Sequence, residues 1–176
     1  MKDPVIAVGG LTATTLLTIG VTVGGFGSAA AQPGDYSTLP VHPNEVTDSM
    51  AYSAAAPIQN PNGQPGVTEV YTHRDGSRQI TNTILILPDA PGAAAAMNGS
   101  QADLANRVAG GKTQPAAVGT GGTMVSGSPP DGSKSVTLLT FTEGNAATTI
   151  EFDGPPKDPV PTDMVIDFGQ KTRHRN

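Results

Sequence analysis

Residues 135–154 read SVTLLTFTEGNAATTIEFDG, and this stretch decides the fold. Gly144 and Asn145 stand between two runs rich in Val, Leu, Thr, Ile and Phe, and a Gly-Asn pair is a typical two-residue turn of a β-hairpin. With these two residues at the turn, Leu139 lies opposite Ile150. Because opposed residues share a face of a sheet, one face receives the apolar side chains of Leu139, Phe141, Ile150 and Phe152.

The other face of this hairpin is the first candidate for contact with a partner. It combines apolar Val136 and Leu138 with acidic Glu151. If a helix covers this face, the hairpin is only the core of a scaffold. If the face is open, it forms an exposed apolar strip of the kind that marks binding surfaces. The candidate partner-binding face consists of Val136, Leu138, Thr140, Thr149 and Glu151.

Composition limits the class of protein. A chain of 176 residues allows one domain plus extensions. Only 4% of the residues are aromatic, and 22 Gly and 16 Pro leave a modest core with some of the chain as coil. The net charge of −5 argues against nucleic-acid binding. The absence of cysteine excludes disulfides, thiol nucleophiles and iron–sulfur clusters.

The N-terminus has the pattern of an export signal. Residues 5–31 carry no charge and follow Lys2, and small residues at Ala29 and Ala31 fit a cleavage site after Ala31. We therefore predict a secreted or cell-envelope protein whose N-terminal segment engages the membrane during export. A retained membrane anchor and an ordinary buried helix are alternatives, although Gly and Thr dilute the apolar run.

Beyond the signal, the sequence divides into two parts. Residues 32–66 hold a high density of Pro, which blocks long helices and central strands. We expect a Pro-rich, partly disordered linker there. The α+β domain is expected to occupy residues 67–176.

The expected elements of this domain follow one another at short intervals. Strands at 67–72 and 78–87 flank a turn at Asp75-Gly76, and a helix over 92–108 starts after Asp89 as N-cap, with a weak point at Asn98-Gly99. The remaining elements are strands at 112–119 and 123–127, the opening hairpin, and a last helix capped by Thr162. The order β-β-α-β-β-β-β-α predicts a mostly antiparallel sheet with the helices packed on one face.

Motifs that carry chemistry are incomplete. The sequence Gly110-Gly111-Lys112-Thr113 resembles the end of a phosphate-binding loop but lacks its first Gly and closes a helix instead of opening one. No G-x-S-x-G nucleophile motif is present. We assign no catalytic, cofactor-binding or metal residues and expect no cofactor.

The histidines and the carboxylates of the hairpin need a separate interpretation. The histidines are not at metal-ligand spacing, and we expect none to converge with a carboxylate in a pocket; they are His42, His73 and His174. The sequence His73-Arg74-Asp75 is typical of a solvated turn. Glu151 and Asp153 share a strand face, where a solvated face competes with a cation-binding or sugar-cleaving pair.

Three stretches of the sequence resemble those of a known group of proteins. GTGGTMVSG at 119–127, LLTFTEGNAATTIEFDGPPKDPVP at 138–161 and the closing helix resemble small exported proteins of mycobacteria. Their broader group is similar to the LpqN/LpqT lipoproteins, which have a PsbP-like α/β/α sandwich. The resemblance covers about residues 67–171 and implies an envelope or secreted protein without known enzymatic activity. It carries no lipid anchor, because this chain lacks the lipobox cysteine.

The sequence therefore favours an exported, non-catalytic protein that binds a partner. The partner is an envelope protein, a lipid or a host protein, and not a nucleic acid. One alternative is a cell-wall-directed hydrolase that uses the acidic face or scattered Ser and His residues. The other is a membrane-tethered factor in envelope assembly.

Overall fold

A computed structural model describes residues 34–47 and 50–175 of the chain; the predicted signal segment lies outside them. The strands are β1 (Tyr52–Ala54), β2 (Ile58–Gln59), β3 (Gly66–His73), β4 (Gln79–Ile86), β5 (Ala109–Pro115), β6 (Thr120–Ser128), β7 (Ser135–Glu143) and β8 (Ala146–Gly154). The helices are η1 (Pro43–Glu45), η2 (Pro61–Gly63), α1 (Ala90–Arg107) and α2 (Thr162–Arg173).

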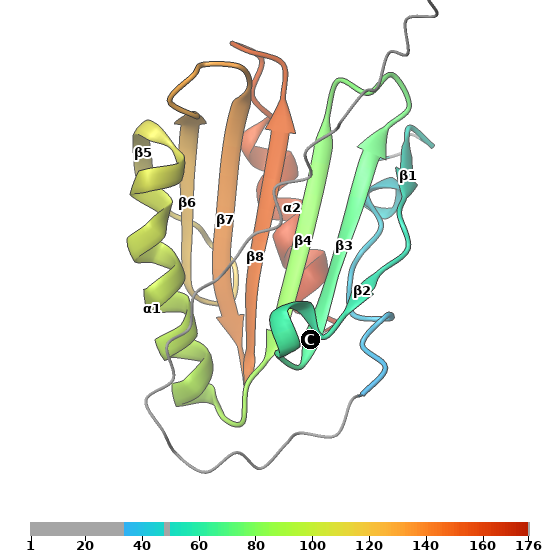
Figure 1. Ribbon diagram of the computed structural model, residues 1–176, viewed down its shortest axis with the longest axis vertical. Coiled ribbons are helices and arrows are strands. Elements are labelled where there is room, and N and C mark those ends of the chain that lie inside the picture. Colours follow the sequence, from blue (N-terminus) through green and yellow to red (C-terminus); the bar gives the residue numbers. More distant parts are fainter. Residues whose placement is uncertain (1–33, 48–49, 176) are drawn as a thin grey trace, which may run out of the picture.

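These strands form one eight-stranded antiparallel sheet within the described residues (Figure 1). Its order is β1-β3-β4-β8-β7-β6-β5, and β2 also pairs with β3. The predicted order β-β-α-β-β-β-β-α is confirmed from β3 to α2. The protein therefore belongs to the α+β class, with a mostly antiparallel sheet.

The opening hairpin has the predicted register. In the pairing of β7 with β8, Leu139 lies opposite Ile150, and Glu143 lies opposite Ala146 at the turn. Gly144 has a φ of 56°, a left-handed conformation that suits glycine at this turn position. The apolar side chains predicted to share one face are all fully buried in one cluster.

Three local predictions need correction. The Asn98-Gly99 pair does not interrupt α1, which runs unbroken from Ala90 to Arg107. The connection between β5 and β6 lies at residues 116–119, so β6 begins at Thr120 and contains most of the glycine cluster. The last helix takes Pro161 as its N-cap, and Thr162 is its first helical residue.

The two helices lie on opposite faces of the sheet, so the expectation of helices on one face is wrong (Figure 1). The reason is visible in β7, where eight of nine residues are buried, including residues that point to both faces. A strand covered on both sides needs apolar or Thr side chains on both of its faces, as in residues 136–142. The layers are therefore α1, the sheet and α2.

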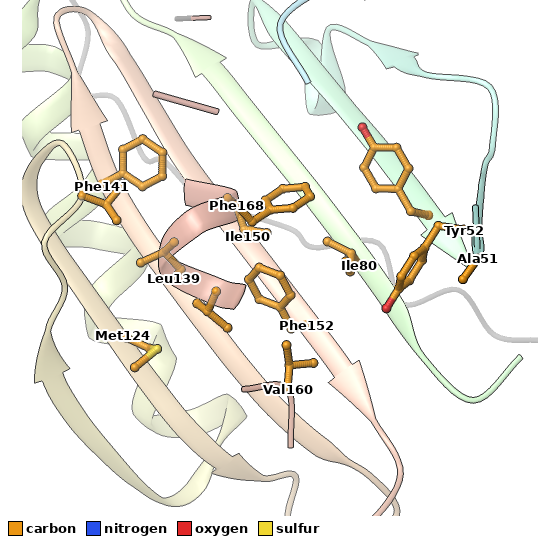
Figure 2. Packing of buried hydrophobic residues seen from close by; sticks show 13 residues of the cluster. Ala51, Tyr52, Ile80, Met124, Leu139, Phe141, Ile150, Phe152, Val160 and Phe168 are labelled. Atoms are coloured by element: carbon orange, nitrogen blue, oxygen red, sulfur yellow. The ribbon is translucent and has the colours of Figure 1, made fainter. Parts of the chain in front are cut away.

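Aromatic rings organise the layer between the sheet and α2. Phe168 of α2 lies edge-on to Phe152 of β8, with ring centroids 5.6 Å apart, and to Tyr71 of β3 at 6.5 Å. Figure 2 shows Phe168 above the strands, close to Ile150 and Phe152. Edge-to-face pairs of this kind add to the burial of apolar area. This cluster is the main core of the domain.

A smaller core fills the layer between the sheet and α1. Leu104 and Val108, at the end of α1, pack with Val136 and Leu138 of β7. Met97 and two alanines of α1 pack on Ala147 of β8. The Asp89 carboxylate caps α1 as predicted, because it accepts a hydrogen bond from the Gly92 N–H at 2.7 Å.

The described part of the Pro-rich segment is built into the domain, which corrects its prediction as a linker. The Asn44 side chain makes two hydrogen bonds with the main chain of Tyr52 in β1: its Nδ2 donates to the Tyr52 carbonyl at 3.1 Å, and its Oδ1 accepts from the Tyr52 N–H at 3.2 Å. Arg175 bonds the Pro40 carbonyl and the Glu45 carboxylate. β1 and β2 lie at the edge of the sheet, where proline between short strands is tolerated. The sheet therefore begins at residue 52, before residue 67.

Asn82 of β4 is a buried polar side chain, and neither its Oδ1 nor its Nδ2 has a hydrogen-bond partner. It is fully buried beside Ile150. A buried amide without partners costs about 1–3 kcal/mol. We therefore expect Asn82→Leu to raise the free energy of unfolding by about 1 kcal/mol in urea denaturation. A loss of stability would show that a bound water or another group satisfies Asn82; Asn82→Asp is the matched destabilising control.

Candidate functional site

The hairpin face proposed for partner binding lies under α1. The structure brings its residues together, with Leu138 opposite Glu151 and Thr140 opposite Thr149. The side chains of Val136 and Leu138 contact α1 and are 4% and 0% exposed. Thr140 and Thr149 are buried as well, and Glu151 is partly buried. This part of the sheet is consequently the core of a scaffold and does not form an open surface.

Four charged residues form a network at the end of α1. Arg107 contacts the Glu151 carboxylate, and Lys134 Nζ lies 2.5 Å from Asp153 Oδ2 and 3.5 Å from Glu151 Oε1. The Glu151 and Asp153 side chains are only 17% and 18% exposed. The acidic pair is therefore neither freely solvated nor open to a cation, because Arg107 and Lys134 neutralise it. The network ties α1 and the β6–β7 loop to β8.

Asp153 is the member of this network with the largest shift in pKa. Burial raises its pKa to about 6, although the hydrogen bond from Lys134 acts in the opposite direction. Its Oδ1 is buried without a hydrogen-bond partner. Burial also opposes the charged form of Lys134, but the two carboxylates prevail and raise the pKa of that amine. Asp153 thus ionises at a cost to the folded state.

This shift predicts a pH dependence of stability. The pKa of an unfolded Asp is near 3.9, so between about pH 4 and 6 the folded state binds more protons than the unfolded state. The contribution of Asp153 is therefore most favourable below pH 4 and decreases as pH rises through 6. We expect the free energy of unfolding of the wild type to fall by about 1 kcal/mol more than that of Asp153→Asn between pH 4 and 7, as measured by denaturant unfolding. A constant difference between the two proteins would contradict this assignment.

A hollow of about 250 Å³ lies at the same end of the strands as this network but on the α2 side of the sheet, where α2 begins. We call it the Arg78 hollow. Its walls come from β1, the β3–β4 hairpin, the loop after β8 and the first turn of α2, which are far apart in sequence. It is lined by Thr47, Tyr52, His73, Arg78, Val160, Pro161 and Met164.

The hairpin turn fixes one basic side chain of this hollow. Asp75 Oδ1 lies 2.6 Å from His73 Nδ1 and accepts hydrogen bonds from the Ser77 N–H and hydroxyl. The bonds from Ser77, followed by that from His73, hold the pKa of Asp75 well below its ordinary value. His73 lines the hollow, whereas its carboxylate partner Asp75 does not.

The order of these contacts differs from that of a nucleophilic triad. In such a triad the serine hydroxyl bonds to the histidine, and the aspartate bonds to the other ring nitrogen. Here the Ser77 hydroxyl bonds to Asp75, at 2.6 Å. The arrangement is a hydrogen-bonded turn that orients His73 and leaves Ser77 without a base to activate it.

Arg78 supplies the second basic group. Its Nη2 lies 2.5 Å from Asp158 Oδ2, and its Nη1 donates to the Asp158 carbonyl at 3.3 Å. The Arg78 side chain is 21% exposed, whereas that of Asp158 is 66% exposed. The guanidinium thus belongs to the wall of the hollow, and its carboxylate partner lies mostly in solvent.

The remaining walls are mainly apolar. Val160 is 6% exposed, and Pro161 and Met164 bring the start of α2 to the hollow. Burial raises the pKa of Tyr52, so its phenol stays protonated over the physiological range. The site therefore offers two basic groups and a phenol against an apolar wall, which suits the binding of a small polar–apolar molecule.

Sequence reasoning missed this site. The sequence placed His73 in a solvated turn and Arg78 at the start of a strand, with no functional role for either residue. The missing signal is the strand order, because the pairing of Gln79 with Asp153 brings the residues before β4 beside the loop after β8. Without that order, nothing connects Arg78 with Asp158, which is 80 residues away.

Comparisons with known proteins give one structural likeness. No protein-family model matches the chain, and no curated protein is significantly similar to it. The fold is similar to the crystal structure of the extracellular domain of PknH from Mycobacterium tuberculosis, with a TM-score of 0.53 and 14% identity over 81% of this chain and 96% of that chain. Membership of the LpqN/LpqT group is not confirmed. No helix among the described residues is long and apolar enough to cross a membrane. What the comparisons establish is therefore a fold shared with a mycobacterial extracellular domain.

Proposed function

We propose that this chain is an exported, non-catalytic domain that binds a ligand outside the cytoplasm. The observation that carries the proposal is the Arg78 hollow, where two basic side chains meet an apolar wall at the end of a core covered on both faces. Pockets that combine apolar walls with a few polar groups are the usual sites of small ligands.

Export is supported from two directions. Residues 5–31 have the length, lack of charge and small-residue ending of a signal segment. The fold resembles a domain that is extracellular in another protein. Either the cell envelope or the surrounding medium is compatible with both observations.

The binding role is preferred to hydrolysis because of the contacts in the hollow. A hydrolytic site needs an activated nucleophile, and the Ser77 hydroxyl is instead bonded to Asp75. The acidic pair that the sequence offered for sugar chemistry is held by Arg107 and Lys134. These contacts favour a recognition module over the cell-wall hydrolase.

Fractionation of a mycobacterial host that produces the full chain tests the proposed location. We expect the protein in the envelope or the medium, with Gln32 as its first residue by N-terminal sequencing. An envelope protein that still begins at Met1 would favour the membrane-tethered alternative. A cytoplasmic protein with an intact N-terminus would overturn the proposal.

Ligand capture tests the proposed activity. The exported form of the chain is expected to retain a small molecule in native mass spectrometry after incubation with an envelope extract. The variant Arg78→Gln should lose that mass, whereas Arg173→Gln, which alters a basic residue outside the hollow near Glu143, should keep it. Extracts that leave no bound mass on the wild type would contradict a ligand-binding role.

A further inference from the structure

The two partners of the Arg78–Asp158 ion pair have unequal environments. Arg78 is mostly buried in the wall of the hollow, whereas two thirds of the Asp158 side chain is in solvent. An ion pair with one partner in water contributes about 0–1 kcal/mol, because water and salt screen it. Another carboxylate can therefore replace that of Asp158 at little cost.

The loop that carries Asp158 is held by its main chain. The Asp158 carbonyl accepts hydrogen bonds from Arg78 Nη1 and from the Ser135 hydroxyl, both at 3.3 Å. The Asp158 N–H donates to the Pro155 carbonyl at 3.0 Å. These bonds do not involve the carboxylate, so its displacement leaves the loop in place and the hollow intact.

The apolar wall adds an interaction that Asp158 does not use. Tyr52, Val160 and Met164 line the hollow beside the guanidinium, whereas the Asp158 side chain is not among the lining groups. A ligand that joins a carboxylate to an apolar group gains contact with this wall, and burial of apolar area is favourable at about 25 cal/mol per Å². Such a ligand has an advantage over the internal carboxylate.

From these contacts we infer that the Arg78 hollow binds a small organic carboxylate with a short apolar group, whose carboxylate takes the place of Asp158 on Arg78. The planar guanidinium matches a carboxylate with two parallel N–H donors. His73, oriented by Asp75, adds a second hydrogen-bonding group to the wall. The volume of about 250 Å³ lies below the usual range of about 300–1,000 Å³ for sites of drug-sized ligands and so selects a smaller molecule.

Three probes separate the parts of this recognition; the inference rests on the proposed binding role. Benzoate carries both the carboxylate and the apolar group, acetate only the carboxylate, and benzamide only the apolar group with a neutral amide. In ¹H–¹⁵N NMR titrations of the exported form of the chain, we expect benzoate to shift amides around the hollow. Acetate should bind at least tenfold more weakly, and benzamide should leave these amides unchanged.

Matched variants test the exchange with Asp158. Arg78→Gln should weaken benzoate binding at least tenfold, and Asp158→Asn should tighten it about threefold, because the internal competitor is lost. Arg173→Gln is the control for loss of a positive charge. If Arg78→Gln unfolds, Arg78→Lys keeps the charge, removes the two-pronged contact and should also weaken binding.

Equal binding of benzamide and benzoate would overturn the inference. Weaker binding of benzoate to Asp158→Asn than to the wild type would overturn it as well. If the wild type retains a ligand from the envelope extract but does not bind benzoate, the proposed binding function is supported and the inference of a carboxylate ligand is refuted. No retention from any extract would refute the proposed function itself.

Discussion

Replacing Phe168 by alanine is expected to lower the free energy of unfolding by about 3–5 kcal/mol, as for other fully buried aromatic residues. Phe168 is 0% exposed and contacts the rings of Phe152 and Tyr71 across the layer between α2 and the sheet. Alanine would leave a cavity at the centre of the main core, where neighbouring rings are too rigid to fill it. Urea unfolding followed by circular dichroism measures the loss.

Ile58→Ala is the control for the Phe168 experiment. Ile58 lies in the edge strand β2 and is 43% exposed, so we expect a loss below about 1 kcal/mol. If Phe168→Ala cost no more than Ile58→Ala, α2 would not pack on the sheet as described.

Leu138→Asp is expected to destabilise the protein by more than about 4 kcal/mol and to leave little folded protein at 37 °C. Leu138 is 0% exposed between the sheet and α1, where it packs with Leu104 and Val108. An aspartate there would enter an apolar layer opposite the acidic Glu151, so it must either ionise without water or bind a proton. Thermal unfolding by calorimetry gives the change.

The contrast with an open face makes this experiment decisive for the hairpin. Ser53 of β1 points to the same side of the sheet but is exposed, so Ser53→Asp should change stability by less than about 0.5 kcal/mol. If Leu138→Asp changed stability as little as Ser53→Asp, the hairpin face would be open, and the hypothesis that it binds a partner would again be supported.

Local chemistry explains why the hairpin was predictable. The Gly144-Asn145 turn and the period-two pattern on either side agree on one register, and a shift by one residue would exchange both faces. The same agreement at Asp75-Gly76 produced the pairing of β3 with β4, where Tyr71 lies opposite Ile80. Each of these pairings joins neighbours in sequence.

The errors arise where the structure depends on partners distant in sequence. The Pro-rich segment forms strands of only three and two residues, which gain their order from β3 and from Asn44 and not from their own propensity. Likewise, the burial of both faces of β7 depends on α1 and α2 taking opposite sides. An alternating pattern reports one buried face, and it cannot show that Thr side chains on the other face, such as Thr140, are also covered.

The candidate site shows the same limit more strongly. Tyr52, His73, Arg78 and Val160 come from three segments, β1, the β3–β4 hairpin and the loop after β8, and no spacing rule relates these segments. They meet because β1 extends the sheet beyond β3 and because β4 lies beside β8. The two faces of the sheet then differ at this end of the strands: the Arg107–Glu151–Lys134–Asp153 network connects α1 to one face, and the Arg78 hollow lies on the α2 side.

The central claim is that the exported form of this chain recognises a ligand at the Arg78 hollow. The most direct measurement is a ¹H–¹⁵N correlation spectrum of that form with and without an extract of the mycobacterial envelope. We predict that the largest shifts fall on amides around Tyr52, His73 and Arg78 and disappear in Arg78→Gln. Shifts that fall instead on residues over α1, or that persist unchanged in Arg78→Gln, would contradict the account.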